Sequence, residues 1–140
     1  MPLLEPDDPK HMAVDRRLRT EIALWLTTVT ADGQPQSTPI WFAWDGETIL
    51  FYSQPGRPKL ANIAANPKVS LHLVGDTEAE DVVTFEGVAA LDPSALPSDQ
   101  VPAFNRYRGL IARFGSTPAG MAADYSVAVR VAPTRVRVLS

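Results

Sequence analysis

Two Asp-Gly pairs constrain the fold of this chain most, because each separates segments rich in Trp, Phe, Ile, Val and Thr. Aromatic and β-branched residues favour strands, and Asp-Gly between two such runs is typical of a tight hairpin turn. The pairs are Asp32-Gly33 and Asp45-Gly46. They predict three consecutive antiparallel strands, which lie at about residues 23–31, 35–44 and 47–53.

Alternating apolar and polar residues predict further strands later in the chain. The run KVSLHL places Val69, Leu71 and Leu73 on one face, and DVVTFEGVAAL predicts a longer strand after it. The closing segment YSVAVRVAPTRVRVLS predicts two strands that are joined near Ala132-Pro133-Thr134. Together with the first three, these segments give six or seven strands.

Three segments have helical periodicity, at residues 12–22, 58–65 and 104–114, and Gly115 is expected to stop the third. Strands interspersed with short helices predict an α+β fold that is mainly antiparallel β. A barrel is favoured over a sandwich, because closure leaves no sheet edge exposed.

The length of the chain predicts one domain. A chain of 140 residues buries most of its apolar surface without a metal or a disulfide. Residues 1–11 contain three prolines and mixed charge, and predict a flexible N-terminal arm before a single domain over residues 12–140. The absence of cysteine excludes a disulfide scaffold, a thiolate nucleophile and Cys-ligated metal sites.

Net charge and hydropathy indicate which partners to expect. The formal net charge of −3 gives no overall field that attracts nucleic acid or an anionic membrane. No segment has the features of a secretory signal or approaches the roughly 20 apolar residues of a membrane span. We therefore expect a cytoplasmic protein that binds a small molecule, without nucleic acid or membrane partners.

The common catalytic motifs are absent. The sequence has no glycine-rich phosphate-binding motif, no Gly-x-Ser-x-Gly and no pair of histidines at ligand spacing. His72 lies on a predicted strand, where a histidine is more often packed or at an interface than a catalytic base. We expect no catalytic side chain and no metal ligand set.

Arg57 and Lys59 lie at the start of the helix predicted over residues 58–65, where cations are normally unfavourable. The first turn exposes unpaired N–H groups, so each added cation costs about 0.3–1 kcal/mol unless an anion is bound. A bound phosphate reverses the sign, and the Ser53 hydroxyl at the preceding strand end is placed to help. The alternative interpretation is two solvated charges beside a Gly-Pro turn.

An aromatic strand precedes this helix. The segment STPIWFAW carries Trp41, Phe42 and Trp44. An apolar aromatic surface next to a phosphate site suits a planar ring on a phosphorylated tail, and a flavin-type cofactor is such a ligand. The alternative is that these aromatics belong to the core. Whether Trp44 faces the cofactor, a partner subunit or the core stays open.

The run LTTVTADGQPQSTPIWFAWDGETILFYSQPGRPKLANIAANPKVSLHL, with VVTFEGVAAL and YSVAVRVAPTRVRV, resembles the pyridoxamine 5′-phosphate oxidase-like split β-barrel superfamily. Within it, the chain looks most like the branch that uses the deazaflavin coenzyme F420. The resemblance implies an FMN-binding split-barrel type of fold, a homodimer, and cofactor sites in grooves between the subunits. The cofactor-binding residues that it implies are Arg57, Lys59, Ser53 and Gln54 at the phosphate, and Thr38, Pro39, Ile40 and Trp41 beside the ring.

One departure from the family bears on function. True pyridoxamine phosphate oxidases have further basic and histidine residues that clamp the substrate phosphate, whereas STPIWFAW has no basic residue and the closing strands have no histidine. The resemblance therefore implies an F420-dependent oxidoreductase that transfers hydride to or from a small electron-poor organic substrate. The alternatives are an FMN-binding oxidoreductase of the same fold, or a non-catalytic carrier of a flavin, a deazaflavin or a haem.

Overall fold

The computed structural model describes residues 2–139 and has a seven-stranded antiparallel sheet at its centre. Neighbouring strands pair in the order β2-β1-β5-β6-β7-β4-β3. Alternate side chains of the strands point into one core, where Leu24, Leu26, Leu71 and Phe85 are buried. The strands are β1 (Leu24–Val29), β2 (Pro35–Ile40), β3 (Phe42–Trp44), β4 (Ile49–Ser53), β5 (Lys68–Leu73), β6 (Val82–Leu91) and β7 (Val127–Leu139).

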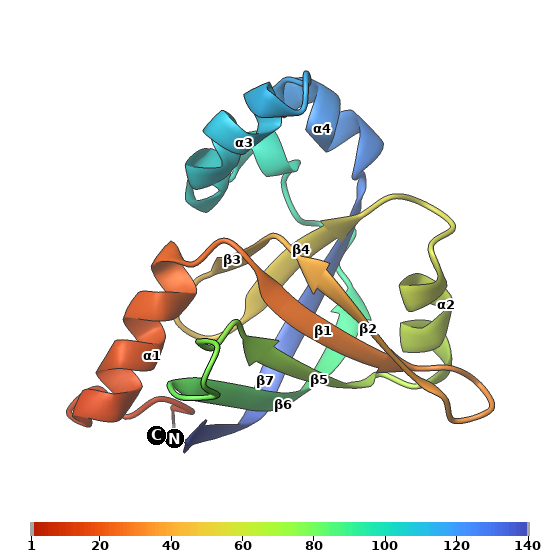
Figure 1. Cartoon of the computed structure of the whole chain (residues 1–140). Coiled ribbons are helices and arrows are strands. Elements are labelled where there is room, and N and C mark those ends of the chain that lie inside the picture. Colours follow the sequence, from red (N-terminus) through yellow and green to blue (C-terminus); the bar gives the residue numbers. More distant parts are fainter. Residues whose placement is uncertain (1, 140) are drawn as a thin grey trace.

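The two end strands of the sheet, β2 and β3, are consecutive in the sequence and are separated only by Trp41. A sheet whose first and last strands are joined by one residue has to curl, and Figure 1 shows it curling into a split barrel. The predicted α+β split-barrel fold is confirmed. The continuous strand predicted over residues 35–44 is wrong, because it breaks at Trp41 and its halves pair with β1 and β4.

Both Asp-Gly pairs form the predicted turns. Gly33 and Gly46 have φ values of 93° and 97°, a region that strains residues with a side chain. The Asp45 carboxylate also accepts hydrogen bonds from the N–H groups of Glu47 and Thr48, at 2.8 and 2.7 Å. These turns fix the β1–β2 and β3–β4 hairpins.

Two helices lie on opposite sides of the barrel, α1 (Pro9–Thr20) and α2 (Pro58–Ala65) (Figure 1). The α2 bounds are those predicted. Helix α1 begins at Pro9 rather than at Met12, because the Asp8 carboxylate caps the N–H of Lys10 at 2.8 Å. A flexible arm over residues 1–11 stays a prediction.

The closing segment forms one strand, β7, and the two strands predicted there are wrong. Pro133 was expected to end the first strand, but it lies at a bulge where the pairing with β6 shifts between Glu86 and Gly87. Proline is tolerated at a bulge because its missing N–H is not needed there. The Thr134 hydroxyl donates to the carbonyl oxygen of Glu86 at 3.2 Å and joins the strands across the irregularity.

A helical lobe over residues 98–125 stands beyond one end of the barrel (Figure 1). The helix predicted over residues 104–114 is divided, and the last helix of the lobe was not predicted. Within residues 2–139, no helix has the length and hydropathy needed to cross a membrane. The lobe consists of the 3₁₀ turns η1 (Ser98–Gln100) and η2 (Pro102–Tyr107) and the helices α3 (Arg108–Arg113) and α4 (Pro118–Asp124).

Tyr107 anchors the lobe to the barrel. Its ring is fully buried, and its hydroxyl donates to the carbonyl oxygen of Ile22 at 2.7 Å and accepts from the N–H of Phe42 at 3.0 Å. Arg106 lies over the rings of Phe42 and Tyr107 and donates to the carbonyl oxygen of Phe42 at 2.6 Å. These contacts hold η2 firmly, whereas α4 has no buried residue.

Candidate functional site

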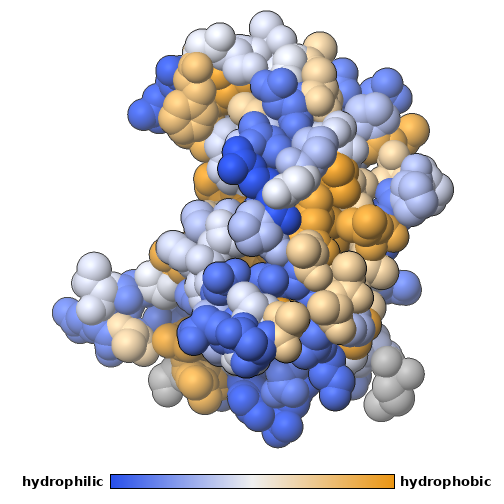
Figure 2. Space-filling view, turned by 90° about the vertical axis from the view of Figure 1, so that its right-hand side faces the viewer, coloured by the Kyte–Doolittle hydropathy of each residue, from blue (hydrophilic) through white to orange (hydrophobic). Residues whose placement is uncertain are grey.

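A pocket lies between the helical lobe and the barrel. It encloses about 250 Å³, and Figure 2 shows the molecule hollowed at this level with apolar side chains gathered there. The barrel contributes the junction of β2 and β3, β4 and the start of α2, and the lobe contributes the opposite wall. Segments far apart in the sequence therefore meet at one cavity.

Aromatic rings form much of the pocket wall. Trp41 stacks on Tyr107 with 4.6 Å between ring centroids and on Phe114 at 6.3 Å. Tyr52 and Phe104 meet edge to face at 5.3 Å. The result is an apolar slot bounded by flat surfaces, which suits a planar ring system.

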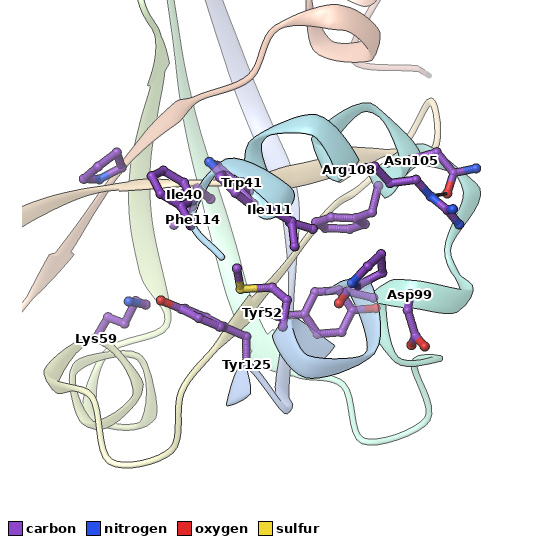
Figure 3. Close-up of a pocket in the computed structure, with 15 residues that line it drawn as sticks. Ile40, Trp41, Tyr52, Lys59, Asp99, Asn105, Arg108, Ile111, Phe114 and Tyr125 are labelled. Carbon is purple, nitrogen blue, oxygen red and sulfur yellow. Dashed lines mark hydrogen bonds between the residues drawn. The ribbon is translucent and has the colours of Figure 1, made fainter. Parts of the chain in front are cut away.

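Lys59 supplies a positive charge at one end of this slot (Figure 3). Its side chain is half-buried, and burial lowers the pKa of the ammonium below its ordinary value, with the charge of Arg57 lowering it further. Among residues 2–139, neither Lys59 nor Arg57 forms an ion pair with a carboxylate. An anion bound here would offset the repulsion between the charges of Lys59 and Arg57.

Arg57 lies outside the pocket wall, one residue before α2, and is exposed. Its guanidinium donates to the side-chain oxygen of Gln54, so both predicted residues belong to one cluster beside Lys59. No side chain caps the start of α2, and its first turn contains no acidic residue. This leaves the helix start available to an anion.

Ser53 does not line the pocket. Its side chain is fully buried, and its hydroxyl donates to the carbonyl oxygen of Gln54 at 2.8 Å. In this arrangement the hydroxyl bonds to the chain itself, and its predicted role at a phosphate stays a prediction.

Three of the four residues predicted beside the cofactor ring line the pocket. Pro39, Ile40 and Trp41 line the pocket, and Thr38 does not. Phe42 and Trp44 are core residues, and the Trp44 indole N–H donates to the Asp15 carboxylate at 2.8 Å. Of the three possibilities left open for Trp44, the structure therefore shows that it faces the core.

His72 lies away from the pocket. It is on the outer face of β5, exposed, and stacked on Trp25 with 6.2 Å between ring centroids. It therefore does not face the cavity in which a haem or flavin would sit. In the part of the chain that the structure describes, no group of three or more His, Asp or Glu side chains is arranged to hold a metal ion.

Asn62 positions the cationic end and was missed by sequence reasoning. It is buried in α2, and its amide donates to the Thr28 hydroxyl and to the Gln36 side-chain oxygen, both at 3.0 Å. These bonds tie α2 to the β1–β2 hairpin and so fix where Lys59 lies. A polar residue on the inner face of a short helix was the available signal.

The lobe side of the pocket was also missed. The sequence predicts only a single helix over residues 104–114 in this region, and α4 is not predicted. At the end of the pocket away from Lys59, the Arg108 guanidinium donates to the Asn105 side chain at 3.2 Å, with Asp99 nearby (Figure 3). The pocket residues from the lobe that sequence reasoning did not assign include Asp99, Phe104, Asn105, Arg108, Ile111, Phe114, Met121 and Tyr125.

The residues present fit a phosphorylated planar cofactor. One end offers the Lys59 ammonium, with the Arg57 guanidinium just outside the wall, and neither has a carboxylate partner within residues 2–139. The middle offers stacked aromatic and aliphatic surfaces. The pocket volume of about 250 Å³ is slightly below the usual 300–1,000 Å³ of ligand sites, so it holds a ring system rather than a whole cofactor.

Comparison with known proteins gives a consistent family. The family model described as pyridoxamine 5′-phosphate oxidase matches residues 11–140. Over 60 residues, 42% of this chain, the sequence is 37% identical to the pyridoxine/pyridoxamine 5′-phosphate oxidase of Aeromonas hydrophila. That match spans only 28% of the length of the relative.

Solved structures with the same fold differ in their stated ligands. An F420 reductase is 29% identical with a TM-score of 0.65, over 88% of this chain and 94% of that one. A conserved hypothetical protein of Mycobacterium tuberculosis is 27% identical with a TM-score of 0.72, over 92% and 83% of the two chains. The haem storage protein of Vibrio cholerae, 22% identical with a TM-score of 0.63 over 96% and 94%, shows the fold alone.

The family match covers nearly the whole described chain, and the split barrel places its aromatic and cationic residues around one pocket. The chain belongs to the pyridoxamine 5′-phosphate oxidase family, within the superfamily of split β-barrels.

Proposed function

We propose that this protein is an oxidoreductase dependent on the deazaflavin coenzyme F420, which transfers hydride to or from a small electron-poor organic substrate. The observation that carries the proposal is the half-buried Lys59, which has no carboxylate partner among residues 2–139 and lies at the end of an aromatic slot. The 29% identical F420 reductase of the same fold supports a deazaflavin over other ring systems.

When bound, a reduced deazaflavin supplies hydride, and the protein contributes binding, orientation and exclusion of water. Lys59, with Arg57 and the start of α2, would hold the phosphate. Ile40 and Trp41 from the barrel and Ile111 and Met121 from the lobe would contact the ring and keep water out. Ser53, Gln54, Thr38 and Pro39 complete the proposed set as neighbours of these groups.

FMN in the same pocket is the second candidate. The segment that is 37% identical to a pyridoxine/pyridoxamine 5′-phosphate oxidase favours it, because the family resemblance implies an FMN-binding type of fold. A phosphate on either cofactor would be attracted to Lys59 in the same way, so binding selectivity decides between them.

Turnover separates an enzyme from a carrier. Purified protein is mixed with reduced coenzyme F420 and a panel of electron-poor acceptors, and the return of fluorescence of the oxidised cofactor is followed. We expect at least one acceptor to be reduced faster than without protein, and Lys59→Ala to slow this rate. Tight binding without acceleration for any acceptor would contradict an enzymatic role and indicate a carrier.

A further inference from the structure

We propose that Tyr125 completes the phosphate site from the lobe side, so that a bound phosphate is clamped between the barrel and α4. This inference rests on the proposed function. It adds a hydroxyl donor from the opposite wall of the pocket to the cationic groups at the start of α2. It also gives the lobe a role in retaining the cofactor.

The placement of Tyr125 carries the inference. Tyr125 follows α4 directly and lines the same pocket as Lys59. In Figure 3 the two side chains approach from opposite walls, with the phenol oxygen of Tyr125 pointing toward the ammonium of Lys59. A phenol hydroxyl can donate to a phosphate oxygen while the neighbouring ammonium supplies positive charge, so the two side chains together offer groups that bind an anion.

The hydrogen bonding of the three tyrosines supports this assignment. The Tyr52 hydroxyl donates to the carbonyl oxygen of Leu96, and the Tyr107 hydroxyl donates to that of Ile22. Both hydroxyls are therefore occupied by bonds within the protein. Within residues 2–139, the Tyr125 hydroxyl is the one without a protein partner, and the residue is exposed, at 38%.

A bridge at this point has a mechanical consequence. Helix α4 contains no buried residue, and the firm anchor of the lobe is at Tyr107, well before it in the chain. A phosphate held by Lys59 on α2 and Tyr125 after α4 would therefore restrain the part of the lobe that is least restrained by packing. Binding of the cofactor phosphate would order α4 over the ring.

Two ligands, one with the phosphate and the tail beyond it and one without them, test the inference. Equilibrium titration compares coenzyme F420 with its deazaflavin riboside, which lacks the phosphate and the tail beyond it, for the wild type and for Tyr125→Phe. We expect Tyr125→Phe to reduce the preference for the phosphorylated ligand about tenfold, while riboside affinity is retained. Tyr52→Phe is the matched control, for which any change should affect both ligands by the same factor.

Hydrogen exchange supplies a second readout. Amides of α4 should exchange more slowly when the wild type is saturated with coenzyme F420, and this protection should be lost in Tyr125→Phe. If Tyr125→Phe keeps the full preference while Lys59→Ala loses it, the role of Tyr125 is refuted and the proposed function stands. If the wild type has no preference for the phosphorylated ligand, the proposed phosphate site is refuted, and this inference with it.

Discussion

The pKa of Lys59 is the property of a single residue that is most directly linked to the proposed phosphate site. Burial and the neighbouring Arg57 lower the pKa of its ammonium from the ordinary 10.5. The folded chain therefore releases this proton at a lower pH than the unfolded chain does. The charged ammonium therefore lowers the free energy of unfolding. This effect is full at pH values below the pKa of Lys59 in the folded chain, and it disappears as the pH rises past the pKa in the unfolded chain.

The same shift predicts how binding depends on pH. A bound phosphate favours the ammonium, so affinity for coenzyme F420 should be highest below the pKa of Lys59 in the free protein and should fall as the pH rises through it. Titrations at successive pH values should show this fall beginning below 10.5. Lys59→Arg should remove the fall, whereas Lys68→Ala, at an exposed lysine, should leave it unchanged.

Gly87 is required by close packing at the β6–β7 bulge. A Cβ there would lie 2.9 Å from Cγ1 of Val131 and 3.1 Å from the carbonyl oxygen of Ala132. Gly87→Ala should therefore destabilise the fold by about 1–3 kcal/mol.

Gly109 in α3 is the matched control, because a Cβ there meets nothing within 4 Å. Gly109→Ala should be neutral or stabilise by about 0.5–1 kcal/mol, since alanine favours helix. Thermal unfolding of both variants measures the difference, and equal melting temperatures would contradict the packing assigned to Gly87.

Sequence reasoning at this scale succeeded where chemistry is local. Arg57 and Lys59 lie at the start of α2 as predicted, because charge and helix position are visible in the sequence, and their role at an anion stays a prediction. The environments of Ser53 and Trp44 were not visible, because both depend on partners set by tertiary packing. A strand residue before a loop looks the same whether its hydroxyl faces a ligand or its own chain.

At the scale of elements, the buried Asn62 contributes a polar contact that ties α2 to the β1–β2 hairpin. Asn62→Leu would leave the buried Thr28 hydroxyl without its donor and should cost about 1–3 kcal/mol in unfolding free energy. It should also weaken coenzyme F420 binding, because α2 carries Lys59. Gln36→Ala is the control, since it removes only the exposed partner of Asn62.

Urea denaturation measures the two stabilities, and a titration measures the two affinities. We expect a clearly larger loss of stability for Asn62→Leu than for Gln36→Ala. Equal losses would show that the bond to Thr28 does not hold α2 in place.

The elements that were predicted well are those with strong local signals. The Asp-Gly turns and α2 follow from glycine, proline and periodicity. The helix over residues 104–114 failed because Phe104, Tyr107 and Leu110 are spaced by three, which also suits a 3₁₀ turn, and tertiary bonds of Tyr107 favour that turn. β7 stayed whole because pairing with β6 outweighs the break expected at Pro133.

At the scale of the whole molecule, one chain encloses a ring-sized cavity. The volume of about 250 Å³ leaves the rest of a cofactor such as coenzyme F420 outside it. We therefore propose a homodimer in which a second copy covers the remaining cofactor surface. Sedimentation equilibrium should give twice the mass of the chain, and the mass of a single chain at micromolar concentration would contradict the dimer.

The sequence predicts that the sheet closes into a barrel, but it does not predict which strands come to lie at its two ends. Strand patterns gave antiparallel β with short helices, but the order that places β2 and β3 at opposite ends depends on long-range pairing. The pocket depends on that order, because Trp41 links the two ends and the lobe packs over the link.

The central claim is that the pocket binds a phosphorylated deazaflavin through Lys59. Its most direct test is a parallel fluorescence titration of cofactor-free wild type and Lys59→Ala with coenzyme F420 and with FMN. The account predicts micromolar binding of coenzyme F420 by the wild type, much weaker binding of FMN, and at least a tenfold loss for Lys59→Ala without loss of fold stability. Equal dissociation constants for the two proteins, or binding of neither cofactor, would contradict it.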